Sequence, residues 1–177
     1  MQLMIMVILL LGLIYLTYED LRFREISVWN LLVIIFFAIS YSLLQSSFTE
    51  VCIYSGINLF ILLVQLVGVT LYYSIKHKRL VKITNDFIGY GDILFLLVPA
   101  VLFGSFLFTT FIIINLALII LLYLILHLFK RRFNTHIPFA GIVSMSTCLV
   151  VVLSSVYKMS LSGNDEYLLH YLRNGIN

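Results

Sequence analysis

Long apolar segments separated by short polar ones make up most of the chain. Six segments of roughly 20 residues carry almost no charge, and they cover residues 2–18, 28–46, 51–75, 92–107, 108–129 and 137–157. A helix needs about 20 apolar residues to cross a bilayer. The pattern predicts an all-α protein with six transmembrane helices, in which Phe103-Gly104-Ser105 separates the fourth helix from the fifth.

Composition supports a membrane location. Hydrophobic residues make up 62% of the 177 positions and charged residues 11%, and the mean hydropathy is +1.11. About a quarter of the residues of a soluble domain are charged, so a soluble fold is excluded. The first segment follows no basic residue and precedes no small-x-small cleavage site, so we expect a membrane helix there and not a signal peptide.

The basic residues predict the orientation of these helices. Nine of the 11 lie after the first, third and fifth segments: Arg22, Arg24, Lys76, Lys78, Arg79, Lys82, Lys130, Arg131 and Arg132. The positive-inside rule makes those loops cytoplasmic, and both termini then lie on the outer side. The formal charge of +3 therefore reflects topology, and we expect no nucleic-acid partner.

The chain has the organisation of a single domain. We find no internal repeat and no linker, so we expect one transmembrane domain over residues 1–158 and a short extracytoplasmic tail over 159–177. Cys52 and Cys148 are isolated, and the four histidines have no ligand spacing. We therefore expect no metal and no cofactor.

Two aspartates lie at the cytoplasmic ends of predicted helices. Asp20 ends the first helix and Asp92 begins the fourth, so both are expected at the same depth. Two carboxyls held close together cannot both ionise cheaply, and such a pair can activate water for attack on a peptide carbonyl. Glu19 points about 100° away from Asp20 around the helix, and we expect it to face lipid headgroups. Glu50 is expected to be a solvated loop residue, and Asp86 a salt-bridging surface residue of a basic loop.

Two glycines precede the second aspartate. Gly89 and Gly91 have no Cβ, so the chain there can adopt a positive φ or let another backbone approach closely. A substrate strand beside Asp92 would use that clearance. The alternative is that the glycines end a loop and permit tight helix packing.

These residues also carry a resemblance to a known family. Gly89-Tyr90-Gly91-Asp92 matches the G-x-G-D signature of membrane aspartic proteases. The segment from Asp20 to Ile26 resembles the D-x-R-x-x-x-I-P element of type IV prepilin peptidases, which include the archaeal preflagellin peptidases. Ile137-Pro138-Phe139-Ala140-Gly141 is similar to their late I-P-F-G-P element. Ser27 replaces the usual proline of the first element, and Ala140-Gly141 replaces Gly-Pro in the last.

The resemblance implies an aspartic endopeptidase of the cytoplasmic (inner) membrane. It would remove the basic leader of pilin-like or flagellin-like precursors at the cytoplasmic face, with the precursor and the membrane lipids as its partners. Asp20 and Asp92 would be the catalytic pair. Residues expected to shape the substrate site are Gly89, Gly91, Arg22 and Pro138. Many members also methylate the new terminus through a cysteine-rich amino-terminal segment that this sequence does not contain, so we expect no N-methyltransferase activity.

Two alternatives stay open. Tyr18-Glu19-Asp20 is similar to the Y-D motif of the presenilin and signal-peptide-peptidase proteases, but those have more spans and a late P-A-L element. A small transporter or pilus-assembly subunit could instead use the aspartates to bind a cation or a proton. Transport sites usually lie near the membrane midplane, whereas both aspartates are expected at its cytoplasmic edge.

Overall fold

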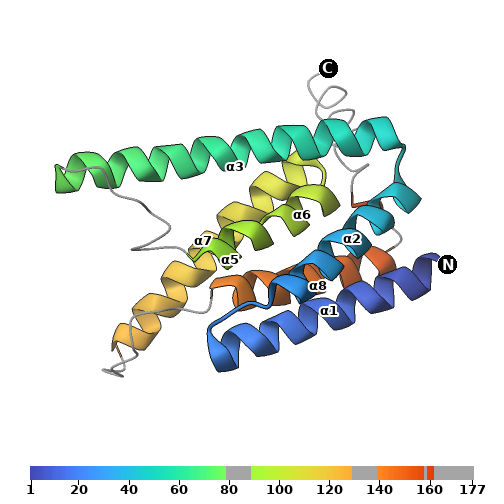
Figure 1. The fold of residues 1–177 in the computed structure, drawn as a ribbon, viewed down its shortest axis with the longest axis horizontal. Helices are drawn as coiled ribbons and strands as arrows, with labels where there is room; N and C mark the ends of the chain where they lie inside the picture. Colours follow the sequence, from blue (N-terminus) through green and yellow to red (C-terminus); the bar gives the residue numbers. More distant parts are fainter. Residues whose placement is uncertain (79–88, 129–138, 158, 162–177) are drawn as a thin grey trace, which may run out of the picture.

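The computed structural model describes residues 1–78, 89–128, 139–157 and 159–161, and every element in these ranges is a helix (Figure 1). The helices are α1 (Gln2–Phe23), α2 (Val28–Gln45), α3 (Phe48–His77), α5 (Tyr90–Phe95), α6 (Leu97–Leu102), α7 (Ser105–Leu128) and α8 (Phe139–Val156). The all-α prediction is confirmed. Five of them, α1, α2, α3, α7 and α8, are long and apolar enough to cross a membrane.

The fourth predicted span is shorter than expected. Helices α5 and α6 together cover only Tyr90–Leu102, and the helical conformation is interrupted between them at Leu96. Pro99 lies one turn later, and its missing N–H removes a helical hydrogen bond at that point. The expected break before α7 is confirmed at Phe103 and Gly104. The count of six spans and the orientation of the termini remain predictions.

Two helices are longer than their apolar segments. Helix α3 begins at Phe48 because Ser47 and Glu50 form a capping box. The Glu50 N–H donates to the Ser47 hydroxyl oxygen at 3.3 Å, and the Ser47 N–H donates to the Glu50 carboxylate at 2.9 Å. Glu50, expected in a loop, is therefore a helix residue. Helix α1 continues to Phe23 and ends at Arg24, whose φ is 56°. Asp20 consequently lies within the last turn of α1 and not at its end.

The helices pack so that α1 lies against both α2 and α8 (Figure 1). Helix α6 packs on α2 and α3, and α7 packs on α3, α6 and α8. In the view of Figure 1, α3 runs along one edge of the molecule and α1 along the opposite edge. Many outward-facing side chains are large and apolar, and Phe36, Phe60 and Phe106 are each more than half exposed, as expected for a surface in contact with lipid.

Small side chains bring α8 against α1. Gly141, Ser144 and Cys148 recur at a spacing of three and four residues, which places them on one face of α8. The Ser144 hydroxyl donates to the Leu13 carbonyl at 2.8 Å, and the Cys148 thiol lies 3.9 Å from the Leu10 carbonyl oxygen. This face directs the start of α8 toward the last turn of α1.

Candidate active site

Asp20 continues the buried stripe of α1. Leu9, Leu13 and Leu16 have no exposed surface, and Asp20 follows them at helical spacing with 5% of its surface exposed. A carboxylate in such a position requires polar partners, because burial without them is costly. The same face that packs the leucines against the bundle thus carries Asp20 into it.

The partner of Asp20 is the amino-terminal end of α8. The Gly141 N–H donates to Oδ2 of Asp20 at 2.6 Å. First-turn amides of a helix have no partner within the helix and carry a partial positive charge, so they bind carboxylates well. Gly141 allows this approach, since a Cβ there would lie 3.1 Å from the same oxygen.

Asp92 reaches the same helix end from the other side. It is the third residue of α5, and the Gly89 N–H donates to its Oδ2 at 3.2 Å. The backbone amide of Ala140 also acts on this carboxyl, as does the charge of Asp20 through space. Asp92 is partly exposed, whereas Asp20 is buried.

The two aspartates, 72 residues apart in the sequence, therefore converge on Ala140 and Gly141. The Asp20 carboxyl is buried and the Asp92 residue is partly exposed. Close carboxyls share a proton, and their titration belongs to the pair and not to either residue. The arrangement suits general acid–base chemistry on a molecule that approaches Asp92.

The preceding glycines have different surroundings. Among the described residues no glycine has a positive φ, and Gly89 has a φ of −65°, so neither glycine uses the positive φ that the sequence allowed for. A Cβ on Gly91 would lie 3.1 Å from Cδ1 of Ile26, in the loop between α1 and α2. The space beside Gly91 is thus occupied by the Ile26 side chain of the same protein. A Cβ on Gly89 would meet only the Asp92 carboxyl.

The two arginines after Asp20 differ in their partners. The guanidinium of Arg22 donates to the Tyr18 hydroxyl and lies 5.3 Å from the centre of the Phe23 ring, on the exposed side of α1. Arg24 interacts with Asp20 through its charge. No described basic side chain forms an ion pair with Asp20, so pairing with an arginine does not explain its position.

The prediction for Glu19 is wrong. Only 8% of its surface is exposed, and its Oε2 lies 3.4 Å from both the Ser27 N and the Asn30 Nδ2 at the start of α2. Glu19 is turned about 100° from Asp20 around α1, and in that direction it faces α2 and not lipid, because α1 packs against α2 on one side and α8 on another.

Other predicted residues lie outside the described ranges. These are Pro138, Asp86 and the loop basic residues Arg79, Lys82, Lys130, Arg131 and Arg132. Within the described ranges, no group of three or more His, Cys, Asp or Glu side chains could hold a metal ion. Ala140, Gly141 and Ile26 are site residues whose contacts the sequence reasoning did not predict, although all three lie in the motifs that carry the resemblance.

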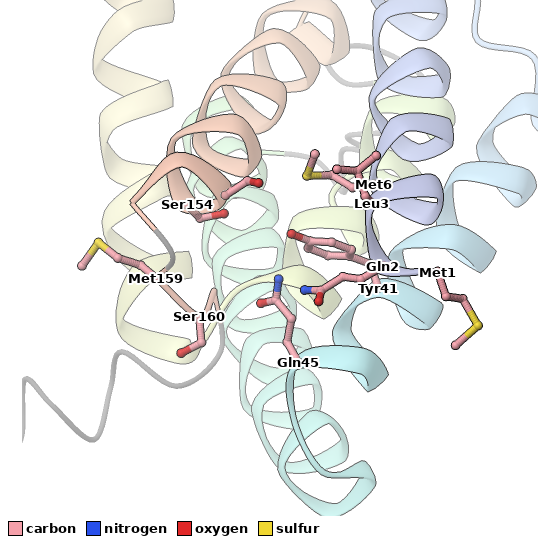
Figure 2. A pocket seen from close by; sticks show the side chains of 10 residues that line it. Met1, Gln2, Leu3, Met6, Tyr41, Gln45, Ser154, Met159 and Ser160 are labelled. Carbon is pink, nitrogen blue, oxygen red and sulfur yellow. The ribbon is translucent and has the colours of Figure 1, made fainter.

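A cavity of about 600 Å³ lies at the other end of the bundle (Figure 2). Its lining includes Gln2, Met6, Tyr41, Gln45 and Ser154, from α1, α2 and α8. Met6 precedes Asp20 by 14 residues on one helix, which corresponds to about 21 Å. The cavity is therefore separate from the aspartate pair.

No protein-family model, curated protein or solved structure matches the chain.

Proposed function

We propose that the protein is a membrane aspartic endopeptidase that removes the basic leader of type IV pilin-like precursors at the cytoplasmic face of the inner membrane. The observation that carries the proposal is the convergence of Asp20 and Asp92 on the first turn of α8. The two motifs that resemble those of prepilin peptidases supply these two residues. The resemblance gives the substrate class, and the geometry supports the chemistry.

Hydrolysis needs only the carboxyl pair and one water. The ionised carboxyl takes a proton from water while the water oxygen attacks the scissile carbonyl carbon. The protonated carboxyl polarises the carbonyl oxygen, and a proton then passes to the leaving nitrogen as the C–N bond breaks. The products are a carboxylic acid and an amine. The amides of Ala140 and Gly141 stabilise the negative charge that stays on the pair throughout.

The positions of the aspartates favour a peptidase over the alternative of a cation or proton transporter. Asp20 lies three residues from the end of α1, and Asp92 is the third residue of α5. A precursor anchored by its own apolar helix would present its scissile bond at such a helix-end level. Transport sites, by contrast, usually lie near the midplane.

The test is co-expression with a pilin-like precursor that has a basic leader, a glycine at the end of that leader and a following apolar helix. Leader removal is followed by gel shift. We expect cleavage by the wild type, and a rate about 100- to 10,000-fold lower for Asp20→Asn and for Asp92→Asn. Glu50→Gln changes an exposed carboxylate at the start of α3 and is expected to cleave like the wild type.

Each variant is quantified in the membrane fraction, so that loss of insertion is separated from loss of catalysis. Full processing by membrane-inserted Asp92→Asn protein would falsify the catalytic pair. Proton or cation flux into vesicles that both substitutions abolish, without any cleavage, would favour the transporter.

A further inference from the structure

Glu19 is a third carboxylate beside the aspartate pair, and the hydrolysis described above does not use it. It is buried, with 8% of its surface exposed. Buried carboxylates are rare unless they have partners. Within the described residues, Glu19 makes its hydrogen bonds to the Ser27 N–H and the Asn30 side-chain amide, each at 3.4 Å.

These bonds fix the start of α2 to the last turn of α1. Ser27 is the N-cap of α2, and its own side chain makes no capping hydrogen bond. Glu19, from a different helix, accepts from the Ser27 N–H and from the Asn30 side chain at the end of α2 that carries partial positive charge. The four-residue connection Arg24–Ser27 is thereby held at both ends, since the Arg24 N–H also donates to the Asp20 carbonyl at 3.1 Å.

The held connection packs directly against the helix of Asp92. Ile26 precedes Ser27, and its Cδ1 and Cβ lie 3.1 and 3.3 Å from the position that a Cβ on Gly91 would occupy. Gly91 is followed by Asp92. A displacement of Ile26 would therefore change the position of the Asp92 backbone relative to Asp20, which α8 holds independently.

We propose that Glu19 is a positioning residue for Asp92, acting through the connection Arg24–Ser27 and the contact of Ile26 with Gly91. As a role in catalysis, this inference rests on the proposed peptidase function. The geometric part, that Glu19 sets the separation of Asp20 and Asp92, holds whatever the pair catalyses.

The first test compares cleavage per folded protein. We expect Glu19→Ala to lower kcat about 10- to 100-fold with little change in KM, since small displacements of reacting groups have effects of this size. Glu19→Gln keeps an acceptor oxygen, so its kcat is expected within a few-fold of the wild type, with an unchanged pH profile. Glu50→Gln is the matched control, because Glu50 is an exposed carboxylate at the start of α3, outside the connection, and glutamine keeps an acceptor for its capping box.

Ile26→Ala removes the contact with Gly91 and leaves Glu19 in place. It is expected to lower kcat similarly, and the double variant is expected to lose less than the product of the two single effects. Wild-type kcat in Glu19→Ala would overturn the proposal. So would a Glu19→Gln protein as inactive as Asp20→Asn, because Glu19 would then act through its proton.

The second test does not depend on activity. The protein with Asp20→Cys and Asp92→Cys, in a background of Cys52→Ser and Cys148→Ser, is treated with a short bifunctional thiol reagent. We expect Glu19→Ala to lower the cross-linking yield several-fold and Glu19→Gln to preserve it. An equal yield with Glu19→Ala would overturn the proposal. A lowered yield, together with no precursor cleavage by the wild-type protein that keeps both aspartates, would support the positioning and contradict the peptidase function alone.

Discussion

At the scale of single residues, Gly141 joins helix packing to the chemistry of the site. Its N–H binds the Asp20 carboxylate at 2.6 Å, and its lack of a side chain leaves room for that carboxylate. A Cβ there would lie 3.1 Å from Oδ2 and 3.5 Å from Cβ of Asp20, and 3.6 Å from the Thr17 carbonyl oxygen. The neighbours on α1 belong to a helix, so they cannot move away independently.

We therefore expect Gly141→Ala to lengthen the bond to Asp20 and to lower precursor cleavage at least about tenfold, as misplacement of a reacting group does. Alanine is otherwise the better helix former by about 0.5–1 kcal/mol, so the thermal stability in detergent should change little. The control is Gly68→Ala, because a Cβ at Gly68 meets nothing within 4 Å. Equal activity of the two variants would contradict the role of Gly141.

The sequence predicted which residues matter at this scale better than it predicted what they touch. Asp20 and Asp92 were placed together because helix periodicity and topology fix depth. The burial of Glu19 against α2 was missed. The angle between two side chains on one helix does not say which of them faces a neighbouring helix, and here that depends on the packing of α1 between α2 and α8. Likewise, the clearance at Gly91 was predicted, but its occupant, Ile26, is set by the fold of the connection after α1.

At the scale of elements, the break between α6 and α7 is stabilised by polar side chains of neighbouring helices. The Asn58 amide on α3 donates to the carbonyls of Ala100 and Phe103 at 2.9 and 2.8 Å. The Ser42 hydroxyl on α2 donates to the Val101 carbonyl at 2.9 Å. The last carbonyls of a helix lack internal partners, so these side chains allow α6 to end inside the bundle.

Asn58→Leu should therefore destabilise the protein by about 1–3 kcal/mol for each of the two carbonyls it leaves unpaired. Ser42→Ala, which removes one bond, should have about half that effect. Thr70→Ala is the control, since Thr70 bonds only the Leu66 carbonyl of its own helix. Denaturant unfolding in detergent measures all three, and an Asn58→Leu protein as stable as the control would contradict this account of the break.

Sequence reasoning at the element scale succeeded where apolar length decides the outcome. The break at Phe103-Gly104 was visible as the one gap in a long apolar run. The early start of α3 was missed, although Ser47 and Glu50 have the capping-box spacing. Hydropathy shows where an apolar segment begins, but a helix can begin before that segment. The role of Asn58 could not be read from the sequence, since a lone polar residue does not identify its partner on another helix.

At the scale of the whole molecule, the short α5–α6 pair raises the question of how many times the chain crosses the bilayer. Its 13 residues would span about 20 Å, less than the roughly 30 Å of a hydrocarbon core. Two bonds nevertheless tie its far end to one side of the bundle. The Gly104 N–H donates to the Leu161 carbonyl at 2.9 Å, and the Leu161 N–H donates to the Gln45 side chain at 3.1 Å. The ends of α2 and α6 and the residues after α8 therefore lie together.

From this we expect six crossings and the end of α8 on the same side as the end of α2. The test uses three single-cysteine proteins, Ser46→Cys, Lys78→Cys and Tyr157→Cys, each with Cys52 and Cys148 replaced by serine. Labelling by a membrane-impermeant maleimide shows on which side of the membrane each cysteine lies. Ser46→Cys and Tyr157→Cys should be labelled in intact cells, and Lys78→Cys only after permeabilisation, because basic loops stay cytoplasmic. If α5 and α6 did not complete a crossing, α8 would run the other way and Tyr157→Cys would label with Lys78→Cys. Asp92 would then begin a re-entrant helix pair that starts and ends on the cytoplasmic side.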